Sequence, residues 1–251
     1  MNFSRRTLIG SGILAATATA AFAAFGRLRS GCKFKAPDSQ GLLGIGEWLN
    51  YSALGAISRN AKAREFARGM ISDKPFANPT SYTQQQVDAM EAAGPDDWKL
   101  TVDGLVTKPS SFTIAQLKQM PKGSQITETN CEEGWSYVAE WAGTPLAAVL
   151  HAVAVKPEAR YAVYFSTEKG WWDSIDMDEA MHSQTLLAWE MNGGKLPVAF
   201  GGPLRLRVPR QLGYKSLKFI SRIHLTDDLK KIENGLGSPE PEFGYAWYAG
   251  V

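Results

Sequence analysis

Cys131 is the residue with the clearest chemical signature. It follows an expected strand over residues 124–130, and Glu132 and Glu133 come directly after it. Nearby negative charge raises the pKa of a thiol and leaves little thiolate near neutral pH, whereas a high-valent metal deprotonates a thiol outright. The pattern favours a metal ligand over a free nucleophile, and it leaves open a buried, inert cysteine. One thiolate cannot hold a metal alone, so the other donors would come from a cofactor.

A second candidate is a basic segment near the end of the chain. No acidic residue lies between positions 205 and 218, and the cations there are Arg205, Arg207, Arg210, Lys215 and Lys218. Strand alternation puts the side chains of Arg205 and Arg207 on one face. Glycines at 201, 202 and 213 permit a close approach of the backbone, so the segment suits a phosphate-bearing ligand. A solvated basic strand and turn is the alternative.

Several common sites have no motif in this sequence. There is no glycine-rich dinucleotide loop, Walker loop, Cys-x-x-Cys pair, haem-attachment motif or Gly-x-Ser-x-Gly elbow. The three histidines, His151, His182 and His224, lack the close spacing of a zinc site. A net charge of +2 without a Lys/Arg run argues against a nucleic-acid partner.

The N-terminus predicts export. Ser4-Arg5-Arg6-Thr7-Leu8 precedes an uncharged stretch from Leu8 to Phe25, which is typical of a twin-arginine signal, with an ordinary secretory signal as the alternative. Cleavage is possible after a small-x-small site at 21–23, and residues 30–32 faintly resemble a lipoprotein box. An uncleaved membrane anchor also stays open, because the apolar run is just long enough to span a bilayer. We therefore expect residues 1–31 to be a signal or anchor and the protein to be periplasmic.

The two cysteines of an exported protein raise the possibility of a disulfide between Cys32 and Cys131. Cys32 lies too close to the signal to be a convincing partner. We therefore expect Cys131 to be an unpaired cysteine, and a free thiol in an oxidising compartment is a liability unless something occupies it.

The first expected elements follow an irregular lead-in over residues 32–80 and open a main domain over residues 81–251. A helix begins at Thr83, with Gln86 completing its cap, and ends at Gly94-Pro95. Strand alternation from Trp98 predicts a β-hairpin that turns at Asp103-Gly104 into Leu105-Val106. A short amphipathic helix over residues 113–120 comes next.

The later elements alternate between short strands and short helices. A helix is expected from Thr144-Pro145, with Thr144 as its cap, and another start with a capping box is expected at 176–179. Strands are expected at 161–166, 185–191, 204–208 and 218–226, with a turn at 192–194. The pattern predicts a mixed, β-rich α+β domain.

Five motifs in order identify a family resemblance. They are Val102-Asp103-Gly104-Leu105-Val106, Cys131-Glu132-Glu133-Gly134-Trp135-Ser136, Glu190-Met191-Asn192-Gly193, Gly201-Gly202-Pro203-Leu204-Arg205-Leu206 and Gly213-Tyr214-Lys215-Ser216-Leu217-Lys218. In this order they closely resemble the sulfite-oxidase-type molybdopterin-dependent oxidoreductases. The resemblance extends from about Phe76 to the C-terminus and is nearest to the bacterial periplasmic branch of protein-methionine-sulfoxide reductase catalytic subunits.

The resemblance implies a cofactor of molybdenum with one molybdopterin. Cys131 would be the molybdenum ligand, beside the dithiolene of the pterin. The positions that match pterin contacts in the family are Asn78, Thr167, Arg205, Ser216, Leu217 and Lys218, and the basic segment adds Arg207 and Lys215. One departure is Phe200, where relatives often carry Asn or His. We also expect no C-terminal immunoglobulin-like domain and no haem module.

The expected activity is oxygen-atom transfer. The residues after Cys131, namely Glu132, Glu133, Trp135 and Tyr137, offer negative charge and aromatic surface, which favours reduction of a neutral S- or N-oxide such as methionine sulfoxide. Trp171 and Trp172 either line the entrance or pack in the core. The resemblance implies a separate membrane haem subunit as electron partner. The alternatives are a sulfite-oxidising enzyme of the same family, a cysteine-nucleophile envelope hydrolase or transpeptidase, and a non-catalytic periplasmic binding domain.

Overall fold

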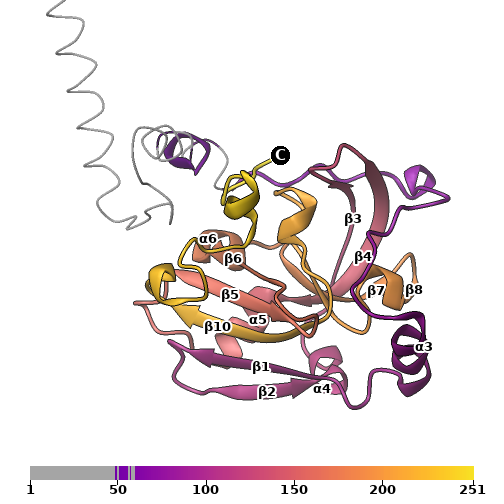
Figure 1. The fold of residues 1–251 in the computed structure, drawn as a ribbon, viewed down its shortest axis with the longest axis horizontal. Helices are drawn as coiled ribbons and strands as arrows, with labels where there is room; N and C mark the ends of the chain where they lie inside the picture. The colour runs from indigo at the N-terminus through magenta and orange to yellow at the C-terminus, as the bar shows by residue number, and fades with distance from the viewer. Residues whose placement is uncertain (1–48, 50, 56, 58–59) are drawn as a thin grey trace, which may run out of the picture. The chain divides into compact units, whose positions relative to one another are not determined.

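The computed structural model describes residues 49, 51–55, 57 and 60–251, which all belong to one compact unit spanning 36–251. Strands dominate this part of the chain, and they form two sheets connected by short helices (Figure 1). The prediction of a mixed, β-rich α+β domain is therefore confirmed.

The first sheet has the strand order β2-β1-β10-β5-β6. Its strands are β1 (Lys99–Gly104), β2 (Ser110–Thr113), β5 (Tyr161–Ser166), β6 (Trp172–Asp176) and β10 (Ile220–Thr226). β1 and β10 are parallel, with Val102 opposite Ile223, and every other pairing in this sheet is antiparallel. The C-terminal strand β10 thus lies between the first strand of the domain and β5.

The second sheet has the order β3-β4-β7-β8, and β9 pairs with β7. Its strands are β3 (Gly123–Asn130), β4 (Ser136–Pro145), β7 (Leu186–Met191), β8 (Gly194–Lys195) and β9 (Arg205–Arg207). The buried residues of β3 are polar, namely Gln125, Thr127 and Thr129. The buried face of β3, an edge strand of this sheet, is therefore polar where the strand leads to Cys131.

The helices are short and connect the strands. They are α3 (Gln84–Ala93), α4 (Ile114–Lys118), α5 (Leu146–Ala152) and α6 (Met177–Ala180), with single 3₁₀ turns η1 (Arg68–Met70), η2 (Val198–Phe200), η3 (Gly213–Lys215), η4 (Leu229–Lys231) and η5 (Glu240–Phe243). Capping boxes start α3 at Thr83 and α4 at Thr113, and the Asp176 side chain caps α6. The starts of α3 and α4 confirm the sequence predictions, and at α6 the cap is present without the expected capping box.

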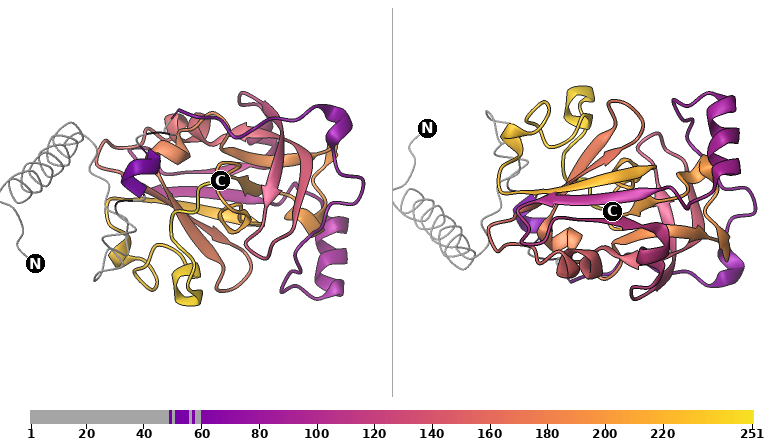
Figure 2. Two further views of the ribbon diagram at one scale, coloured as in Figure 1. Left: turned by 90° about the horizontal axis from the view of Figure 1, so that it is seen from above. Right: turned by 90° about the horizontal axis from the view of Figure 1, so that it is seen from below.

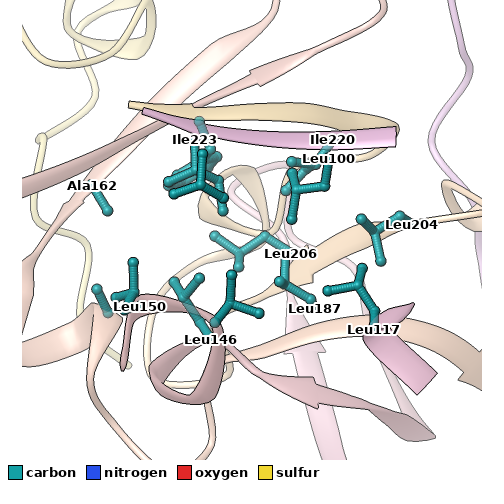
Figure 3. Close-up of a cluster of buried hydrophobic side chains, with 14 of the residues drawn as sticks. Leu100, Leu117, Leu146, Leu150, Ala162, Leu187, Leu204, Leu206, Ile220 and Ile223 are labelled. Atoms are coloured by element: carbon teal, nitrogen blue, oxygen red, sulfur yellow. The ribbon is translucent and has the colours of Figure 1, made fainter. Parts of the chain in front are cut away.

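The main core lies between the first sheet and a layer made by α5, β7 and β9. Figure 3 shows Leu100, Ile220 and Ile223 directed from β1 and β10 toward Leu206 and Leu146. All five side chains are fully buried. Burial of apolar side chains of this size stabilises a fold by about 1.5–3 kcal/mol each, so this layer holds the two sheets together.

Before α3, the chain runs beside the second sheet. The Phe66 amide donates to the Ile126 carbonyl of β3 at 2.9 Å, and the Ser72 amide donates to the Val138 carbonyl of β4 at 2.9 Å. Figure 2 shows this indigo segment passing along the sheet before it turns into α3. The expected irregular lead-in is thus tied to the sheet by backbone hydrogen bonds at these points.

Two local predictions were wrong. Asp103-Gly104 is not a two-residue hairpin turn, because β1 continues through Gly104 and pairs with β10, and the antiparallel partner β2 begins only at Ser110. Thr144 does not cap α5, since it lies within β4 and its hydroxyl donates to the Leu117 carbonyl at 2.8 Å. Both errors came from local motifs whose residues have partners elsewhere in the fold.

The expected export signal over residues 1–31, the lipoprotein-box resemblance and Cys32 lie outside the described residues. Within the described part of the chain, no helix has the length and apolar character needed to cross a membrane. Cys131 is a free, buried cysteine.

Candidate active site

A cavity of about 490 Å³ opens beside the end of β3. Its walls come from the segment before α3, the turn after β3, the β5–β6 loop, η2, β9, the stretch from η3 toward β10, and η5. Of the predicted site residues, those that line it are Asn78, Cys131, Arg205, Ser216, Leu217 and Lys218. Segments far apart in sequence therefore meet at the predicted cysteine.

The Cys131 side chain is held by a tight turn between β3 and β4. The Cys131 amide donates to the Trp135 carbonyl at 3.0 Å, and the Gly134 amide donates to the Cys131 carbonyl at 3.1 Å. The thiol donates to Glu132 Oε2 at 3.3 Å. Burial raises the pKa of the Cys131 thiol to about 11, and the Glu132 carboxylate adds to this rise, against a backbone hydrogen bond at Glu133 that lowers the pKa. The free side chain is therefore a thiol at neutral pH.

Two arginines of β9 lie deeper, against the ring of Trp141. The guanidinium carbons of Arg205 and Arg207 lie 5.0 and 5.5 Å from the Trp141 ring centroid. Arg205 donates to the carbonyls of Phe200 and Ser216, and Arg207 donates to Ser216 Oγ at 3.0 Å. Burial lowers the pKa of Arg207 to about 9, although the nearby Tyr137 acts to raise it. Within the described chain neither guanidinium has a carboxylate partner, so the region carries uncompensated positive charge.

Lys218 contributes the third cation of the site. Its ammonium donates to the carbonyls of Asn78 and Ala199, both at 2.7 Å. Burial, and then the charge of Arg205, lowers the pKa of Lys218 to about 8. Lys218 thereby joins the segment before α3 to η2 across the cavity.

Among the described residues, three buried polar atoms on the cavity lining have no hydrogen-bond partner. They are Asn78 Oδ1, Thr129 Oγ1 and Arg205 Nε. An unsatisfied buried polar group costs about 1–3 kcal/mol, so native proteins rarely leave several in one place unless a ligand is meant to meet them. The unpaired atoms mark this wall as a place for a polar ligand.

The segment before α3 is fastened to the β5–β6 loop by Glu168. One carboxylate oxygen of Glu168 accepts hydrogen bonds from the Thr80 hydroxyl at 2.6 Å and from the Ser81 amide at 2.7 Å. The next residue along the chain, Tyr82, has its hydroxyl 2.5 Å from Thr167 Oγ1. The wall that carries Asn78 is thus held in place by side chains of the β5–β6 loop.

Three predicted site residues are not brought to the cavity. Lys215 is fully buried, and its ammonium pairs with Asp173 Oδ1 at 2.6 Å. Arg207 lies behind Arg205, where its hydrogen bonds go to Ser216 and to β3. Thr167 contacts Tyr82 and does not line the cavity.

Aromatic side chains cover one side of the cavity in a continuous series. The ring centroids of Phe76 and Trp135 are 4.9 Å apart, those of Trp135 and Tyr137 are 5.9 Å apart, and those of Tyr137 and Phe200 are 5.9 Å apart. Phe200 therefore supplies an apolar contact to the lining. Trp171 also lines the cavity.

The second tryptophan of the β5–β6 region behaves differently from Trp171. Trp172 is buried in β6 and stacks on Phe165, with ring centroids 6.4 Å apart. The sequence left both roles open for the two tryptophans, and the structure separates them.

Several lining residues were not among the predicted site residues. They are Thr129, Glu168, Tyr214, Glu240, Phe243 and Tyr245. Thr129 could have been found, because it occupies an inward position of β3 two residues before Cys131. The others reach the cavity through long-range packing of the C-terminal segment and of the β5–β6 loop.

No group of three or more His, Cys, Asp and Glu side chains that could hold a metal ion occurs within the described residues. His224 is engaged by Asp103, with Nδ1 and Oδ1 2.6 Å apart. Cys131 is accordingly the sole sulfur donor among the residues that line the cavity.

Comparison with known proteins identifies the family. The model of the oxidoreductase molybdopterin binding domain matches residues 85–232, which include Cys131, Arg205 and Lys218. The chain belongs to this family. It is therefore an oxidoreductase with a molybdopterin-binding domain, as the sequence motifs predicted.

Relatives of this molybdopterin-binding oxidoreductase include three bacterial proteins at 31% identity. The putative protein-methionine-sulfoxide reductase subunit YedZ1 of Azospira oryzae aligns with 89% of this chain and 82% of its own length. The protein-methionine-sulfoxide reductase catalytic subunit MsrP of Ralstonia nicotianae aligns with 68% of this chain, which spans 59% of that relative. For MsrP of Gluconobacter oxydans the shares are 70% and 67%.

A solved structure supports the fold of this oxidoreductase. The sulfane dehydrogenase SoxCD from Paracoccus pantotrophus matches with a TM-score of 0.52 and 26% identity, over 54% of this chain and 39% of that chain.

Proposed function

We propose that this chain holds molybdenum with one molybdopterin through Cys131 and catalyses oxygen-atom transfer, reducing a neutral S- or N-oxide such as methionine sulfoxide. The observation that carries the proposal is the pairing, in one cavity, of a buried free thiol with buried cations that lack carboxylate partners. A thiol with a raised pKa suits a metal ligand, because a metal removes its proton directly.

The cavity fits a cofactor of this kind in size and polarity. Its volume of about 490 Å³ lies within the range of pockets that bury cofactor-sized ligands. Asn78 Oδ1 and Thr129 Oγ1 are buried acceptors without donors, and pterin N–H groups would satisfy them. Arg205, Lys218 and the Ser216-Leu217 backbone would hold the rest of the group.

Electrostatics supports a phosphate in the same place. The guanidinium groups of Arg205 and Arg207 both lie against the ring of Trp141, and burial lowers the pKa of both. Two adjacent buried cations repel each other unless an anion compensates them. A pterin phosphate would supply that anion, with Arg207 acting from behind Arg205 through its field.

In this arrangement the protein's own residues position the cofactor and shield the reacting atoms from water. When bound, the molybdenum cofactor supplies the metal that exchanges an oxygen atom with the substrate as electrons pass. The thiol of Cys131 gives its proton to solvent or to Glu132, whose Oε2 accepts from it at 3.3 Å. The aromatic series from Phe76 to Phe200 limits water at the reacting atoms and leaves a path for an apolar sulfide or amine.

The polarity of the entrance favours a neutral substrate. Glu132, Glu133 and Glu240 line the cavity, and its lysine and arginine donors already bond to backbone carbonyls. With the proposed pterin phosphate compensating Arg205 and Lys218, a dianionic substrate such as sulfite would meet mainly carboxylates at this entrance. The names of the three relatives agree with an oxide-reducing role.

The non-redox alternatives find less support. A cysteine hydrolase needs a thiolate and a base, but the pKa of Cys131 is raised to about 11 and no histidine lies among the described residues of the cavity wall. A binding domain without catalysis would leave the family assignment of an oxidoreductase unexplained.

Export and electron supply complete the proposal. The twin arginines at positions 5 and 6 support export of the folded, cofactor-loaded protein to the periplasm, with residues 1–31 as signal or anchor. Two relatives are named catalytic subunits, which supports a separate electron-transfer subunit, in our proposal a membrane haem protein.

The test is a substrate screen on protein purified after export. Reduced viologen supplies electrons for methionine sulfoxide, other sulfoxides and N-oxides, and ferricyanide accepts them from sulfite. We expect viologen-dependent oxide reduction that disappears in Cys131→Ser, with sulfite poor or inert. Sulfite oxidation without oxide reduction would replace this proposal by the sulfite-oxidising alternative.

A further inference from the structure

Glu240 is a buried carboxylate with no assigned role at the edge of the cavity. It is the first residue of η5, it is 8% exposed, and it lines the cavity. No side chain or backbone group of the described residues makes a hydrogen bond or an ion pair with its carboxylate. A buried carboxylate without a partner is costly, so a ligand with positive charge or N–H donors is its natural complement.

The segment that carries Glu240 is firmly placed. The Glu240 amide donates to Ser238 Oγ at 3.2 Å. Farther along, the buried ring of Trp247 donates to Ser174 Oγ at 2.8 Å and packs on Tyr161 with centroids 5.7 Å apart. The unpaired carboxylate therefore belongs to a well-packed part of the cavity wall, because hydrogen bonds hold the chain before and after it.

Other carboxylates give the same region a negative field. Burial raises the pKa of Glu240 to about 7, and the charges of Asp173 and Glu132 add to this rise, while Lys215 opposes it. Glu133 also lines the cavity. The nearest cation, Lys215, is already paired with Asp173 at 2.6 Å. The cations that do line the cavity, Arg205 and Lys218, bond to backbone carbonyls. Because the proposed pterin phosphate compensates Arg205 and Lys218, a positively charged group of a substrate would be attracted to this side of the cavity.

Large exposed apolar side chains surround the same cavity. Phe76, Trp171, Phe243 and Tyr245 are 51%, 48%, 73% and 41% exposed, and all four line it. We call these four residues the aromatic rim. A small substrate enclosed in the cavity would not need exposed aromatic surface outside it, whereas contact with a polypeptide does. Aromatic faces beside carboxylates also favour lysine and arginine side chains.

We propose that Glu240 and the aromatic rim select polypeptide segments in which positive charge lies next to the oxide-bearing residue. This inference rests on the proposed oxide reductase activity and adds a charge preference to it. Glu240 acts as a specificity residue that accepts a hydrogen bond from a flanking lysine or arginine, while the rim packs on the flanking chain.

The test compares short peptides that carry one methionine sulfoxide flanked by lysine, by glutamine or by glutamate. The protein is the loaded enzyme, the reductant is reduced viologen, and the readout is the ratio of kcat/KM for the lysine and glutamate peptides. Because both peptides meet the same preparation, differences in folding or cofactor loading cancel in the ratio. We expect a ratio of about ten or more at low salt, and a decline toward unity at high salt.

Glu240→Gln should lower that ratio by about threefold or more, since it removes the charge at nearly constant volume. The matched control is Glu242→Gln in the same 3₁₀ turn, because Glu242 is exposed and does not line the cavity. The control should leave the ratio unchanged. For the aromatic rim, Phe243→Ala should weaken all the peptides alike, whereas Met70→Ala, which removes an exposed apolar side chain away from the cavity, should not.

A binding measurement gives a second readout that needs no turnover. Fluorescent peptides with methionine sulfone in place of the sulfoxide are titrated by anisotropy, and the lysine peptide should bind more tightly than the glutamate peptide in a Glu240-dependent way. Equal binding, or an unchanged kcat/KM ratio in Glu240→Gln, would overturn the inference. The inference would also be overturned by a rim variant that slows only the transfer of electrons from a haem donor to the enzyme. That result would show that the aromatic rim binds the donor and not the peptide. Failure of the proposed function would look different, as no sulfoxide of any charge would be reduced.

Discussion

The ion pair between Lys215 and Asp173 allows a direct test of whether Lys215 stabilises the fold or binds the proposed cofactor. The two side chains are 1% and 2% exposed, and the ammonium lies 2.6 Å from Asp173 Oδ1 and 3.1 Å from the Ser174 carbonyl. Lys218, three residues later, lines the cavity instead. The sequence treats both lysines as phosphate ligands, whereas in the structure one is paired with a buried carboxylate and the other lines the cavity.

Lys215→Met should therefore destabilise the protein without its cofactor. The substitution leaves Asp173 buried without its cation, and removing one partner of a buried pair costs about 3–5 kcal/mol. For a domain of this size that loss corresponds to a decrease of roughly 6–20 °C in the melting temperature. Replacing both partners, as in Asp173→Leu with Lys215→Met, should restore most of the loss because no unpaired charge remains buried.

The assay is thermal and denaturant unfolding of cofactor-free protein, with Lys218→Met as the matched control. Lys218→Met should change unfolding of the cofactor-free protein by no more than about 1 kcal/mol, yet it should reduce the pterin retained after purification. The reasoning would be refuted if Lys215→Met unfolded like the wild type but lost its pterin. That result would restore Lys215 as a phosphate ligand.

Three further predictions concern other regions. Burial, and then Arg210, lowers the pKa of His182 to about 4, so the unfolded chain protonates first. Stability is then complete above pH 6.5 and is lost as pH falls from 6.5 toward 4, by on the order of 2 kcal/mol, and His182→Gln should remove this component in pH-dependent denaturant unfolding. An equal slope in both proteins would contradict it. Glu168→Ala should speed hydrogen exchange over residues 76–82, because the Glu168 carboxylate accepts hydrogen bonds from residues 80 and 81. Unchanged exchange would show that these hydrogen bonds do not hold the segment in place. Gly104→Ala should cost about 2–4 kcal/mol in thermal unfolding, since φ is +86° and the new Cβ would lie 2.2 Å from the Leu225 carbonyl oxygen; a neutral effect would show that β1 can shift.

Local signals were sufficient where the structure depends on neighbouring residues. The capping boxes at Thr83 and Thr113 need only the Gln three positions later, and both helices begin where the motif places them. The turn at 192–194 was equally accessible, because Asn192 and Gly193 both adopt positive φ.

Strands buried on both faces could not be recognised from alternation. β4 runs from Ser136 to Pro145 with nearly all of its residues buried, so it carries no period-two pattern. β6 is buried throughout and contains Asp173, Ser174 and Asp176, which read as a polar loop in the sequence. The Lys215 ammonium neutralises Asp173, and Lys215 lies 42 residues away.

The candidate site could likewise be predicted only where a local sequence motif carries the residue. The sequence motifs predicted Cys131, Arg205 and Lys218, and all three line the cavity. Spacing alone could not separate Lys215 from Lys218, because the difference depends on Asp173. Glu240 belongs to no motif, and its position follows from the long-range anchoring of Trp247.

The central claim is that the sulfur of Cys131 is a ligand of molybdenum held by one pterin in this cavity. X-ray absorption at the molybdenum edge, on exported protein whose metal and pterin contents are measured in the same sample, tests it most directly. We expect molybdenum and pterin in about equal amounts, near one of each per chain, with a sulfur ligand that disappears in Cys131→Ser. Correctly matured protein without molybdenum, or an unchanged sulfur shell in the variant, would contradict it.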